Sequence, residues 1–259
     1  MENKANIKAI ILAAGKGTRL RPYTLDKPKC LVEVDGKSLI DRQLAIISTA
    51  NIHPILMIGG YKAGMLKRPG VTVRLNPRYA ETNMVWTLFS AEADLEGDVL
   101  ISYGDIVYSK DILLEIIDSD ADIAVAIDLE WESYWRARNE NPLDDAETLK
   151  LHSDGRIYEI GQKPHSLQDI EGQYMGLIKL SSHGVEVLKK VFSDAKQGSG
   201  LLGKPVEQAY MTDLLQAVID AGYPVQSVPT TSAWVEVDTV SDLKSETTKS
   251  RLAQIESST

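Results

Sequence analysis

The chain has 259 residues, 43% hydrophobic and 25% charged, which is ordinary for a folded globular protein and enough for one large α/β domain or two small ones. Its formal net charge of −9 argues against a general nucleic-acid binder, which would present a net basic face. A single cysteine excludes an internal disulfide framework and fits a reducing cytoplasm, and no stretch approaches the ~18 apolar residues of a membrane span.

The first predicted strand is a short apolar run, residues 7–12, with the pattern of a strand buried on both faces. It leads into small residues, two glycines and two arginines; residues 12–22 read LAAGKGTRLRP. Small residues let a backbone approach a ligand closely, and successive loop N–H groups form a concavity suited to anions. Arg19, Arg21, Lys27 and Lys29 add the positive charge that a polyphosphate needs. The string fits neither a P-loop nor a dinucleotide fingerprint, so it predicts a phosphate-binding loop of another kind.

A helix over residues 38–50 and strands over residues 54–58 and 71–75 follow the loop. Ser38 is the expected N-cap of this helix, and Cys30, in the preceding segment, is expected to be a buried strand residue. Strand, helix and strand with short connections predict right-handed parallel crossovers and a doubly wound, mostly parallel twisted sheet of the Rossmann-like α/β class. Ligands collect at the carboxyl ends of such strands, where the first loop and Gly60 both lie. The two loops are therefore expected to share one pocket.

Two polar positions come next at predicted element boundaries. Asn83 stands at a helix start, where it is either the N-cap or a contact to the base or ribose of a nucleotide. Asp105 follows the predicted strand 98–102 and sits beside a glycine. A carboxylate at such a place suits Mg²⁺, which prefers one or two carboxylates plus phosphate oxygens, although a turn-capping role is the alternative.

The middle of the chain changes character after a helix at residues 110–119 and a strand at 123–127. Residues 149–152 and 156–160 predict a β-hairpin with an Asp-Gly turn, inserted before a strand at 177–180. We expect this insertion to form a lid that carries the specificity for a second substrate. The acids and arginines between residues 131 and 147 are either a solvated surface or a grip on a zwitterion, with acids on its ammonium and arginine on its carboxylate.

The last third predicts helices over residues 182–192 and 212–221, the second capped by Thr212, and a strand over 225–228. Asp238 places a second acid at the end of a strand near residue 236, and a polar helix from Ser241 leads into a tail expected to be frayed. We expect one domain over residues 1–259, with a nucleotide-binding half (7–128), an acceptor-binding half (129–240) and a C-terminal helix and tail (241–259).

These motifs resemble the nucleotidyltransferase superfamily of sugar-nucleotide pyrophosphorylases over nearly the full length. The matching positions are residues 12–21, Lys29, Asp105, Lys163 and Asp238. The strings NPRY (76–79), TNM (82–84) and EVDT (236–239) look like the phosphocholine and 2-aminoethylphosphonate cytidylyltransferase branch. Residues 141–150, with DIVY (105–108), YMGL (174–177) and YMT (210–212), look closest to the CTP:phosphoglutamine cytidylyltransferases, which act in the phosphoramidate modification of bacterial capsules.

The resemblance implies transfer of CMP from CTP to a small anionic or zwitterionic phosphorylated acceptor, with release of pyrophosphate and help from Mg²⁺. Such a nucleophile is already ionised near neutral pH, so no general base is needed. The implied catalytic residues are Arg19 and Lys29, and the implied metal ligands are Asp105 and Asp238. The implied nucleotide-binding residues are Leu12, Ala13, Ala14, Gly15, Lys16, Gly17, Thr18, Gly60, Asn83 and Asp105, and the implied acceptor-binding residues are Arg136, Asp145, Lys163, Glu171 and Tyr174.

Three alternatives stay open. The first is a nucleotidyltransferase of the same fold that uses a hexose 1-phosphate with UTP, dTTP or GTP. The second, from a different class, is a non-catalytic nucleotide-binding regulatory subunit. The third is a phosphocholine or 2-aminoethylphosphonate cytidylyltransferase. Trp131, Tyr134 and Trp135 offer the aromatic faces that the quaternary ammonium of phosphocholine favours, whereas Arg136 and Arg138 suit a carboxylate better. The sequence leaves the oligomeric state open.

Overall fold

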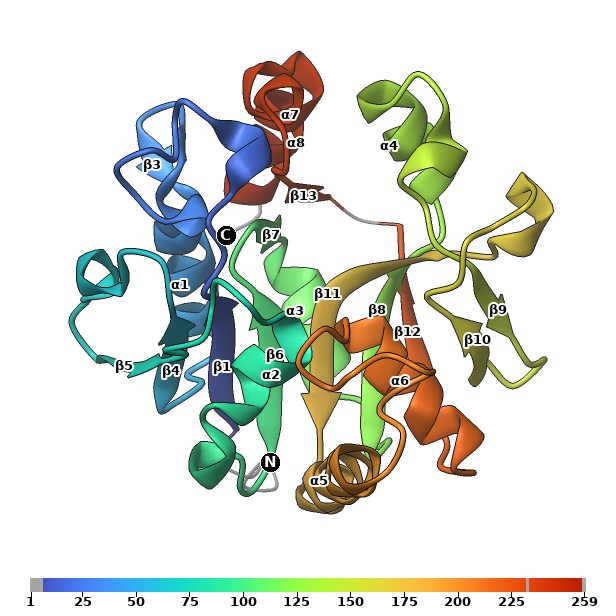
Figure 1. The fold of residues 1–259 in the computed structure, drawn as a ribbon. Coiled ribbons are helices and arrows are strands. Elements are labelled where there is room, and N and C mark those ends of the chain that lie inside the picture. Colours follow the sequence, from blue (N-terminus) through green and yellow to red (C-terminus); the bar gives the residue numbers. More distant parts are fainter. Residues whose placement is uncertain (1–6, 232, 258–259) are drawn as a thin grey trace.

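The computed structural model describes residues 7–231 and 233–257 and is built on one seven-stranded sheet (Figure 1). Its strands are β1 (Lys8–Ala13), β4 (Ile55–Gly59), β5 (Val71–Leu75), β6 (Val99–Tyr103), β8 (Ile123–Asp128), β11 (Gln173–Leu180) and β12 (Gln226–Thr230). Their order is β12-β8-β11-β6-β1-β4-β5. Every neighbouring pair is parallel except the two made by β11, which runs antiparallel to β6 and β8. The mostly parallel, Rossmann-like sheet predicted from the sequence is confirmed.

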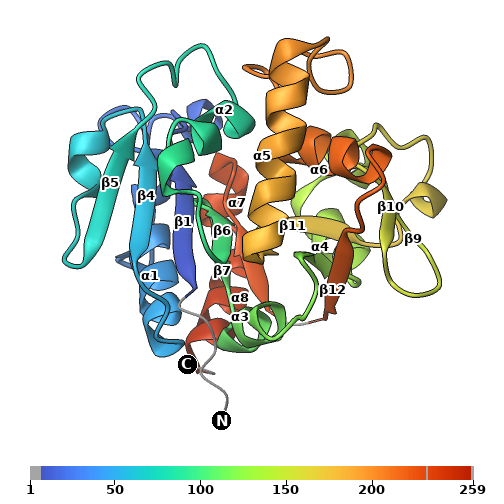
Figure 2. The ribbon, with the colours of Figure 1, turned by 90° about the horizontal axis from the view of Figure 1, so that it is seen from below.

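Helices cover both faces of this sheet, as Figure 2 shows. One layer holds α1 (Leu39–Thr49), α3 (Lys110–Ile117) and α8 (Glu246–Ser257), and the other holds α2 (Met84–Phe89), α5 (Ser182–Gln197) and α6 (Met211–Asp220). Strand β1 lies between two cores because its residues alternate: Ile11 belongs to one apolar cluster and Ile10 to the other. This double burial explains why β1 reads as a continuous apolar run.

Smaller elements surround the carboxyl end of the sheet. The short strand β7 (Ile106–Tyr108) pairs antiparallel with β13 (Trp234–Glu236), which leads into α7 (Val240–Lys244). Strands β2 (Glu33–Val34) and β3 (Lys37–Ser38) form a tight pair before α1. The predicted hairpin exists as β9 (Leu149–Leu151) and β10 (Ile157–Ile160), beside α6 (Figure 1). Its role as a lid stays a prediction.

Three local predictions are wrong. Cys30 is buried, but it lies in a 3₁₀ turn (Lys29–Leu31) rather than in a strand. Thr212 does not cap α6; the helix begins one residue earlier, at Met211, and the carboxylate of Asp213 accepts the N–H of Tyr210 at 2.8 Å. The buried side chain of Thr212 instead packs against Gly161.

The third correction concerns the C-terminal helix, which is packed rather than frayed over its described residues. Leu252 and Ile255 of α8 are 2% and 1% exposed, and α8 contacts β13. The guanidinium of Arg42 in α1 also pairs with Glu256. These contacts join α8 to the strand that precedes Asp238.

A further helix, α4 (Trp131–Arg138), was not predicted from the sequence. Its buried side chains are Trp131, Tyr134 and Trp135. This i, i+3, i+4 spacing is the signal that an aromatic-rich helix leaves in a sequence. Within the described residues, no helix is long and apolar enough to cross a membrane.

Candidate active site

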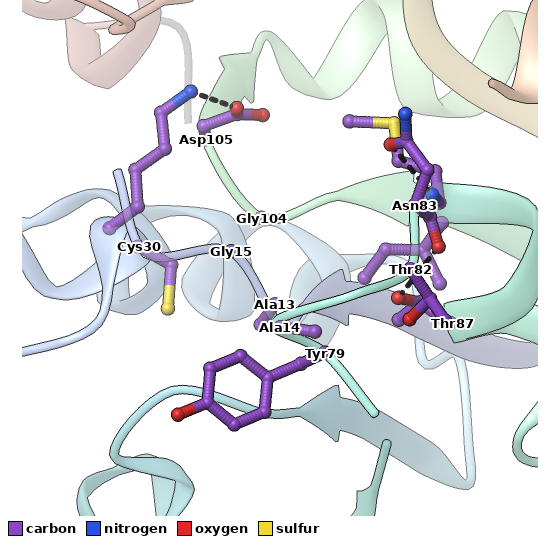
Figure 3. Close-up of a pocket in the computed structure, with 13 residues that line it drawn as sticks. Ala13, Ala14, Gly15, Cys30, Tyr79, Thr82, Asn83, Thr87, Gly104 and Asp105 are labelled. Carbon is purple, nitrogen blue, oxygen red and sulfur yellow. Dashed lines mark hydrogen bonds and ion pairs between the residues drawn. The ribbon is translucent and has the colours of Figure 1, made fainter. Parts of the chain in front are cut away.

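A cavity of about 130 Å³ opens where the carboxyl ends of β1 and β6 meet the segment before α2 (Figure 3). Asp105 lies at one end of it, and Thr82 and Asn83 lie across from it. Its lining residues are Leu12, Ala13, Ala14, Gly15, Lys29, Cys30, Tyr79, Thr82, Asn83, Met84, Thr87, Gly104 and Asp105. The cavity therefore stands at the sheet edge where the first loop was expected to bind its ligand.

The backbone after β1 is held by neighbouring loops. The carbonyl of Leu12 accepts the N–H of Gly104 at 3.0 Å, and the carbonyl of Ala14 accepts the N–H of Tyr61 at 3.2 Å. A Cβ on Gly104 would stand 2.9 Å from the Leu12 oxygen, so this close approach requires glycine. A Cβ on Gly15 would meet no described neighbour within 4 Å, so the backbone there adjoins open space.

Two other glycines allow residues of the cavity wall to pack closely against the loops behind them. Gly17 has φ +58°, and a Cβ on it would stand 2.9 Å from the Cβ of Lys29. Because glycine has no Cβ, the side chain of Lys29 can pack against the loop here. A Cβ on Gly60 would stand 2.4 Å from the Cβ of Tyr79. These glycines shape the wall without lining it. The expected nucleotide-binding residues that do not line the cavity are Lys16, Gly17, Thr18 and Gly60.

The opposite wall is organised by a buried asparagine. Asn76 is 1% exposed, and its amide donates to the hydroxyls of Thr82 and Thr87 at 3.0 Å each. Asn83 accepts the N–H of Met84 at 2.9 Å, which confirms that it is the N-cap of α2. Asn83 also lines the cavity, so capping and ligand contact are compatible there.

Four charged side chains meet at the mouth of the cavity. The ammonium of Lys29 forms ion pairs with both Asp105 and Asp238, and the guanidinium of Arg19 pairs with the second oxygen of Asp238. Lys29, Asp105 and Asp238 have side chains 12–14% exposed, whereas Arg19 is 59% exposed. The structure thus brings together both implied catalytic residues and both implied metal ligands.

This meeting depends on contacts between distant segments. Gln43 of α1, fully buried, donates to the carbonyls of Tyr103 and Ile106 at 2.9 Å each and so holds the turn that carries Asp105. The N–H of Val237 donates to the carbonyl of Asp105 at 3.1 Å, extending the pairing of β7 with β13. Asp238, the next residue, is thereby placed beside the Asp105 turn.

A buried arginine supports the same strand from α4. Arg138 is 4% exposed in its side chain and bonds Glu236 at 2.9 Å and Asp242 at 3.0 Å. Asp242 in turn accepts the backbone N–H groups of Asp238 and Thr239 at 3.1 and 2.8 Å. Arg138 therefore links α4 to the backbone that carries Asp238.

The aromatic side chains of α4 are used in this packing. The guanidinium of Arg138 lies 5.1 Å from the ring centre of Tyr134 and 5.2 Å from that of Trp135, and Arg251 lies 4.0 Å from Tyr134. Both rings are at most 4% exposed, as is Trp131. These two rings are thus buried and packed against arginines of the protein, so little of them is accessible to a quaternary ammonium.

Burial and neighbouring charge set the protonation of the site. Burial alone would lower the pKa of Lys29, but the carboxylates of Asp105 and Asp238 outweigh it and raise that pKa above its ordinary value, so Lys29 stays charged. Burial raises the pKa of Glu236 to about 7 against the pull of Arg138. Burial also raises the pKa of the Cys30 thiol to about 12, so this cysteine is not a thiolate nucleophile.

The expected acceptor-binding residues do not converge in the same way. Lys163 donates to the carbonyl of Leu143 at 2.5 Å, and Glu171 accepts the N–H of Leu151 at 2.8 Å. Tyr174 packs edge-on against Tyr103, the residue before Gly104 of the cavity wall, with ring centres 5.6 Å apart.

The other two acceptor candidates are surface residues with protein partners. Arg136 is 55% exposed and pairs with Glu132 one turn away, on the outer side of α4. Asp145 lies 3.8 Å from Arg19, which joins it to the charged mouth of the cavity.

Several cavity residues were not identified as ligand contacts from the sequence: Cys30, Tyr79, Thr82, Met84, Thr87 and Gly104. Most belong to the segment 76–87. Its Asn-Pro-Arg-Tyr and Thr-Asn-Met motifs were used to recognise a family resemblance, and only Asn83 among them was expected to contact a ligand. The signal that was available is Asn76, because an asparagine after a strand and before a helix cap often organises a turn.

The chain is similar to known nucleotidyltransferases in sequence. Residues 9–166 match the MobA-like NTP transferase domain. The CTP:phosphoglutamine cytidylyltransferase of Campylobacter jejuni is 36% identical over 249 residues, which cover 92% of this chain and 98% of that protein. The choline-phosphate cytidylyltransferase of Streptococcus pneumoniae is 36% identical over 108 residues, but this match covers only 40% of this chain and 47% of that protein.

Solved structures show the same fold. The inositol-1-phosphate CTP transferase of T. maritima superposes with a TM-score of 0.75 over 98% of both chains, at 21% identity. The CTP:phosphocholine cytidylyltransferase of Streptococcus pneumoniae superposes with a TM-score of 0.71 over 92% of this chain and 96% of that one, at 23% identity.

Proposed function

The chain belongs to the MobA-like NTP transferase family, and from this membership we propose that it is a cytidylyltransferase, which transfers CMP from CTP to a small phosphorylated acceptor and releases pyrophosphate. The acceptor that we propose is phosphoglutamine (L-glutamine phosphoramidate), for the modification of a capsule or another surface polysaccharide. The observation that carries this proposal is the similarity to CTP:phosphoglutamine cytidylyltransferase along nearly the whole of both chains.

The geometry of the cavity supports this chemistry. In our proposal the amides after β1 hold the triphosphate, Arg19 stabilises the departing pyrophosphate, and Lys29 neutralises charge near the α-phosphate. Since the acceptor oxygen is already ionised, catalysis consists of positioning the reactants and neutralising charge. The ion pairs of Lys29 with Asp105 and Asp238 keep this ammonium charged and fixed at the cavity mouth.

Asp105 and Asp238 are the residues that would hold Mg²⁺. Within residues 7–231 and 233–257 no cluster of three or more His, Cys, Asp or Glu side chains has the geometry of a metal site. Two carboxylates fit Mg²⁺ nonetheless, because this ion is usually held by one or two carboxylates together with substrate phosphates. One oxygen of Asp105, Oδ1, is buried without a hydrogen-bond partner in the described part of the chain, which suits a cation ligand. The ion would supply Lewis-acid charge to phosphate oxygens.

The acceptor is proposed to bind on the side of residues 129–240, and the nucleotide on the side of residues 7–128. The structure weakens the case for phosphocholine, because the rings of Tyr134 and Trp135 pack against Arg138 within the protein. It also weakens the expected role of Arg138 in binding a substrate carboxylate, because Glu236 and Asp242 already occupy that guanidinium. Lys163 and Tyr174 stay proposed acceptor contacts.

The test is a pyrophosphate-release assay with four nucleotides (CTP, UTP, GTP and dTTP), each combined with phosphoglutamine, phosphocholine, 2-aminoethylphosphonate and a hexose 1-phosphate. We expect turnover with CTP and phosphoglutamine to exceed all other combinations. Preference for UTP, GTP or dTTP with the hexose phosphate would replace the proposal with the pyrophosphorylase alternative, and no turnover at all would favour a regulatory subunit. Mn²⁺ binding followed by electron paramagnetic resonance, in the wild type and Asp105→Asn, tests the ion site independently of activity.

A further inference from the structure

Glu147 is a mostly buried glutamate for which the proposed mechanism gives no role. It lies two residues before β9, and its backbone is fixed by the buried side chain of Gln173. The N–H of Glu147 donates to Oε1 of Gln173 at 3.3 Å, and Nε2 of Gln173 donates to the carbonyl of Glu147 at 2.5 Å. This clamp joins Glu147 to the start of β11, directly before Tyr174.

The carboxylate of Glu147 feels the charge of Lys204 but forms no ion pair in the part of the chain that the structure describes. Among residues 7–231 and 233–257, no lysine, arginine or histidine forms an ion pair with it. The neighbouring Lys204 is committed to Asp213, to whose two oxygens it donates at 2.8 and 2.9 Å. Thr212 supplies a hydrogen bond to Glu147, while Asp213 adds a like charge nearby. Burial raises the pKa of Glu147, as it does for a carboxylate whose charge is poorly compensated.

The position of Glu147 relative to the reaction centre follows from two tyrosines. Tyr103 ends β6 two residues before Asp105, and Tyr174 packs edge-on against it. The phenol groups of both tyrosines are close enough to Glu147 and to Asp105 to feel the charge of each carboxylate. The tyrosine pair is therefore close both to Asp105, in the proposed phosphate-binding region, and to Glu147, in the proposed acceptor-binding half.

We propose that Glu147 binds a primary ammonium group of the acceptor. This inference rests on the proposed function and names one feature of its substrate. A buried carboxylate without a cation is stabilised by a ligand that brings one, and a primary ammonium supplies three N–H donors as well as charge. A quaternary ammonium has no N–H donor, so the same subsite discriminates against choline-like acceptors.

The other acids of this half suit that role less well. Asp145 is exposed and already lies near Arg19, and Glu171 is exposed with its carboxylate bonded to the N–H of Leu151. The sequence shows several acidic residues in this region but does not indicate which of them would bind an ammonium group. Burial and the lack of an ion pair select Glu147.

The experiment compares phosphoglutamine with its Nα-acetyl derivative, which lacks the ammonium, in the pyrophosphate-release assay with CTP. A charge-assisted hydrogen bond contributes about 1.5–3 kcal/mol, so we expect wild-type kcat/KM to favour the ammonium-bearing acceptor by about 10- to 150-fold. Glu147→Gln keeps the shape and removes the charge, and we expect it to bring this ratio close to one while leaving the KM for CTP unchanged. Glu159→Gln, a matched change at a glutamate of the adjacent hairpin, is expected to keep the wild-type ratio.

Each outcome decides something. A wild-type enzyme that uses both acceptors equally overturns the inference without any variant, so a failure of Glu147→Gln to fold does not protect it. An unchanged ratio in folded Glu147→Gln overturns it as well. Absence of turnover with CTP and every acceptor refutes the proposed function itself, and so is distinct from failure of the Glu147 subsite.

Discussion

Replacement of Arg138 by methionine removes a buried charge from the network behind Asp238. Methionine keeps an unbranched stem between the rings of Tyr134 and Trp135 but leaves Glu236 and Asp242 without their guanidinium. Breaking a buried ion pair by removing one partner typically costs about 3–5 kcal/mol. For a chain of this size, each kcal/mol lowers Tm by about 2–4 °C. We therefore expect Arg138→Met to lower the melting temperature by about 6–20 °C.

The matched control lies on the same helix. Arg136 is 55% exposed and pairs with Glu132 on the helix surface, so Arg136→Met should change stability by less than about 0.5 kcal/mol. Thermal unfolding followed by circular dichroism, at equal protein concentration, measures both variants. A loss below about 1 kcal/mol in Arg138→Met would refute the view that this arginine compensates the carboxylates of Glu236 and Asp242.

The pH dependence of this loss has a definite sign. Burial raises the pKa of Glu236 to about 7, above its ordinary value of 4.5, although Arg138 opposes the shift. The native state therefore binds a proton that the unfolded state has released, and stability falls as pH rises from about 4.5 toward the folded-state pKa. Without Arg138 that pKa rises further, so the falling range extends to higher pH. We expect Arg138→Met to lose more stability relative to wild type at pH 8 than at pH 6; an equal loss at both values would contradict this.

Lys29→Ala and Asp238→Ala should each lower turnover by about 10²- to 10³-fold while far-UV circular dichroism shows a folded chain; near-wild-type turnover in either variant would remove that residue from the mechanism. Cys30, 2% exposed and with a pKa raised to about 12, should react with iodoacetamide at pH 8 at least about 100-fold more slowly in the native chain than in guanidinium, and equal rates would contradict its burial. Gly60→Ala would press a methyl group to 2.4 Å from a tyrosine of the cavity wall and should cost about 1–3 kcal/mol. Gly64→Ala, whose methyl group would meet no described atom within 4 Å, should be neutral in the same melting assay.

Local patterns were sufficient for several elements around the cavity. The predicted strand 71–75 coincides with β5, and Ser38 caps α1 as predicted. Asn83 caps α2, which was one of the two roles expected for it. These features follow from short-range rules, namely β-branched residues alternating with polar ones for a half-exposed strand and side-chain oxygens at helix starts. The C-terminal segment was predicted to be frayed because most of its residues are polar. Two buried apolar side chains, Leu252 and Ile255, are enough to pack α8 against the protein.

The sequence by itself determined the class of fold and indicated the loop that we propose to bind phosphate, because apolar periodicity and small-residue turns depend on residues only a few positions apart. Only the tertiary structure decided which charges face one another. The chain separates Lys29 from Asp105 by 76 positions and from Asp238 by 209. The turn held by Gln43 and the pairing of β7 with β13 bring the three side chains into contact. The same holds for Glu147: its burial beside a lysine that is paired with Asp213 is set in three dimensions and leaves no local pattern in the sequence.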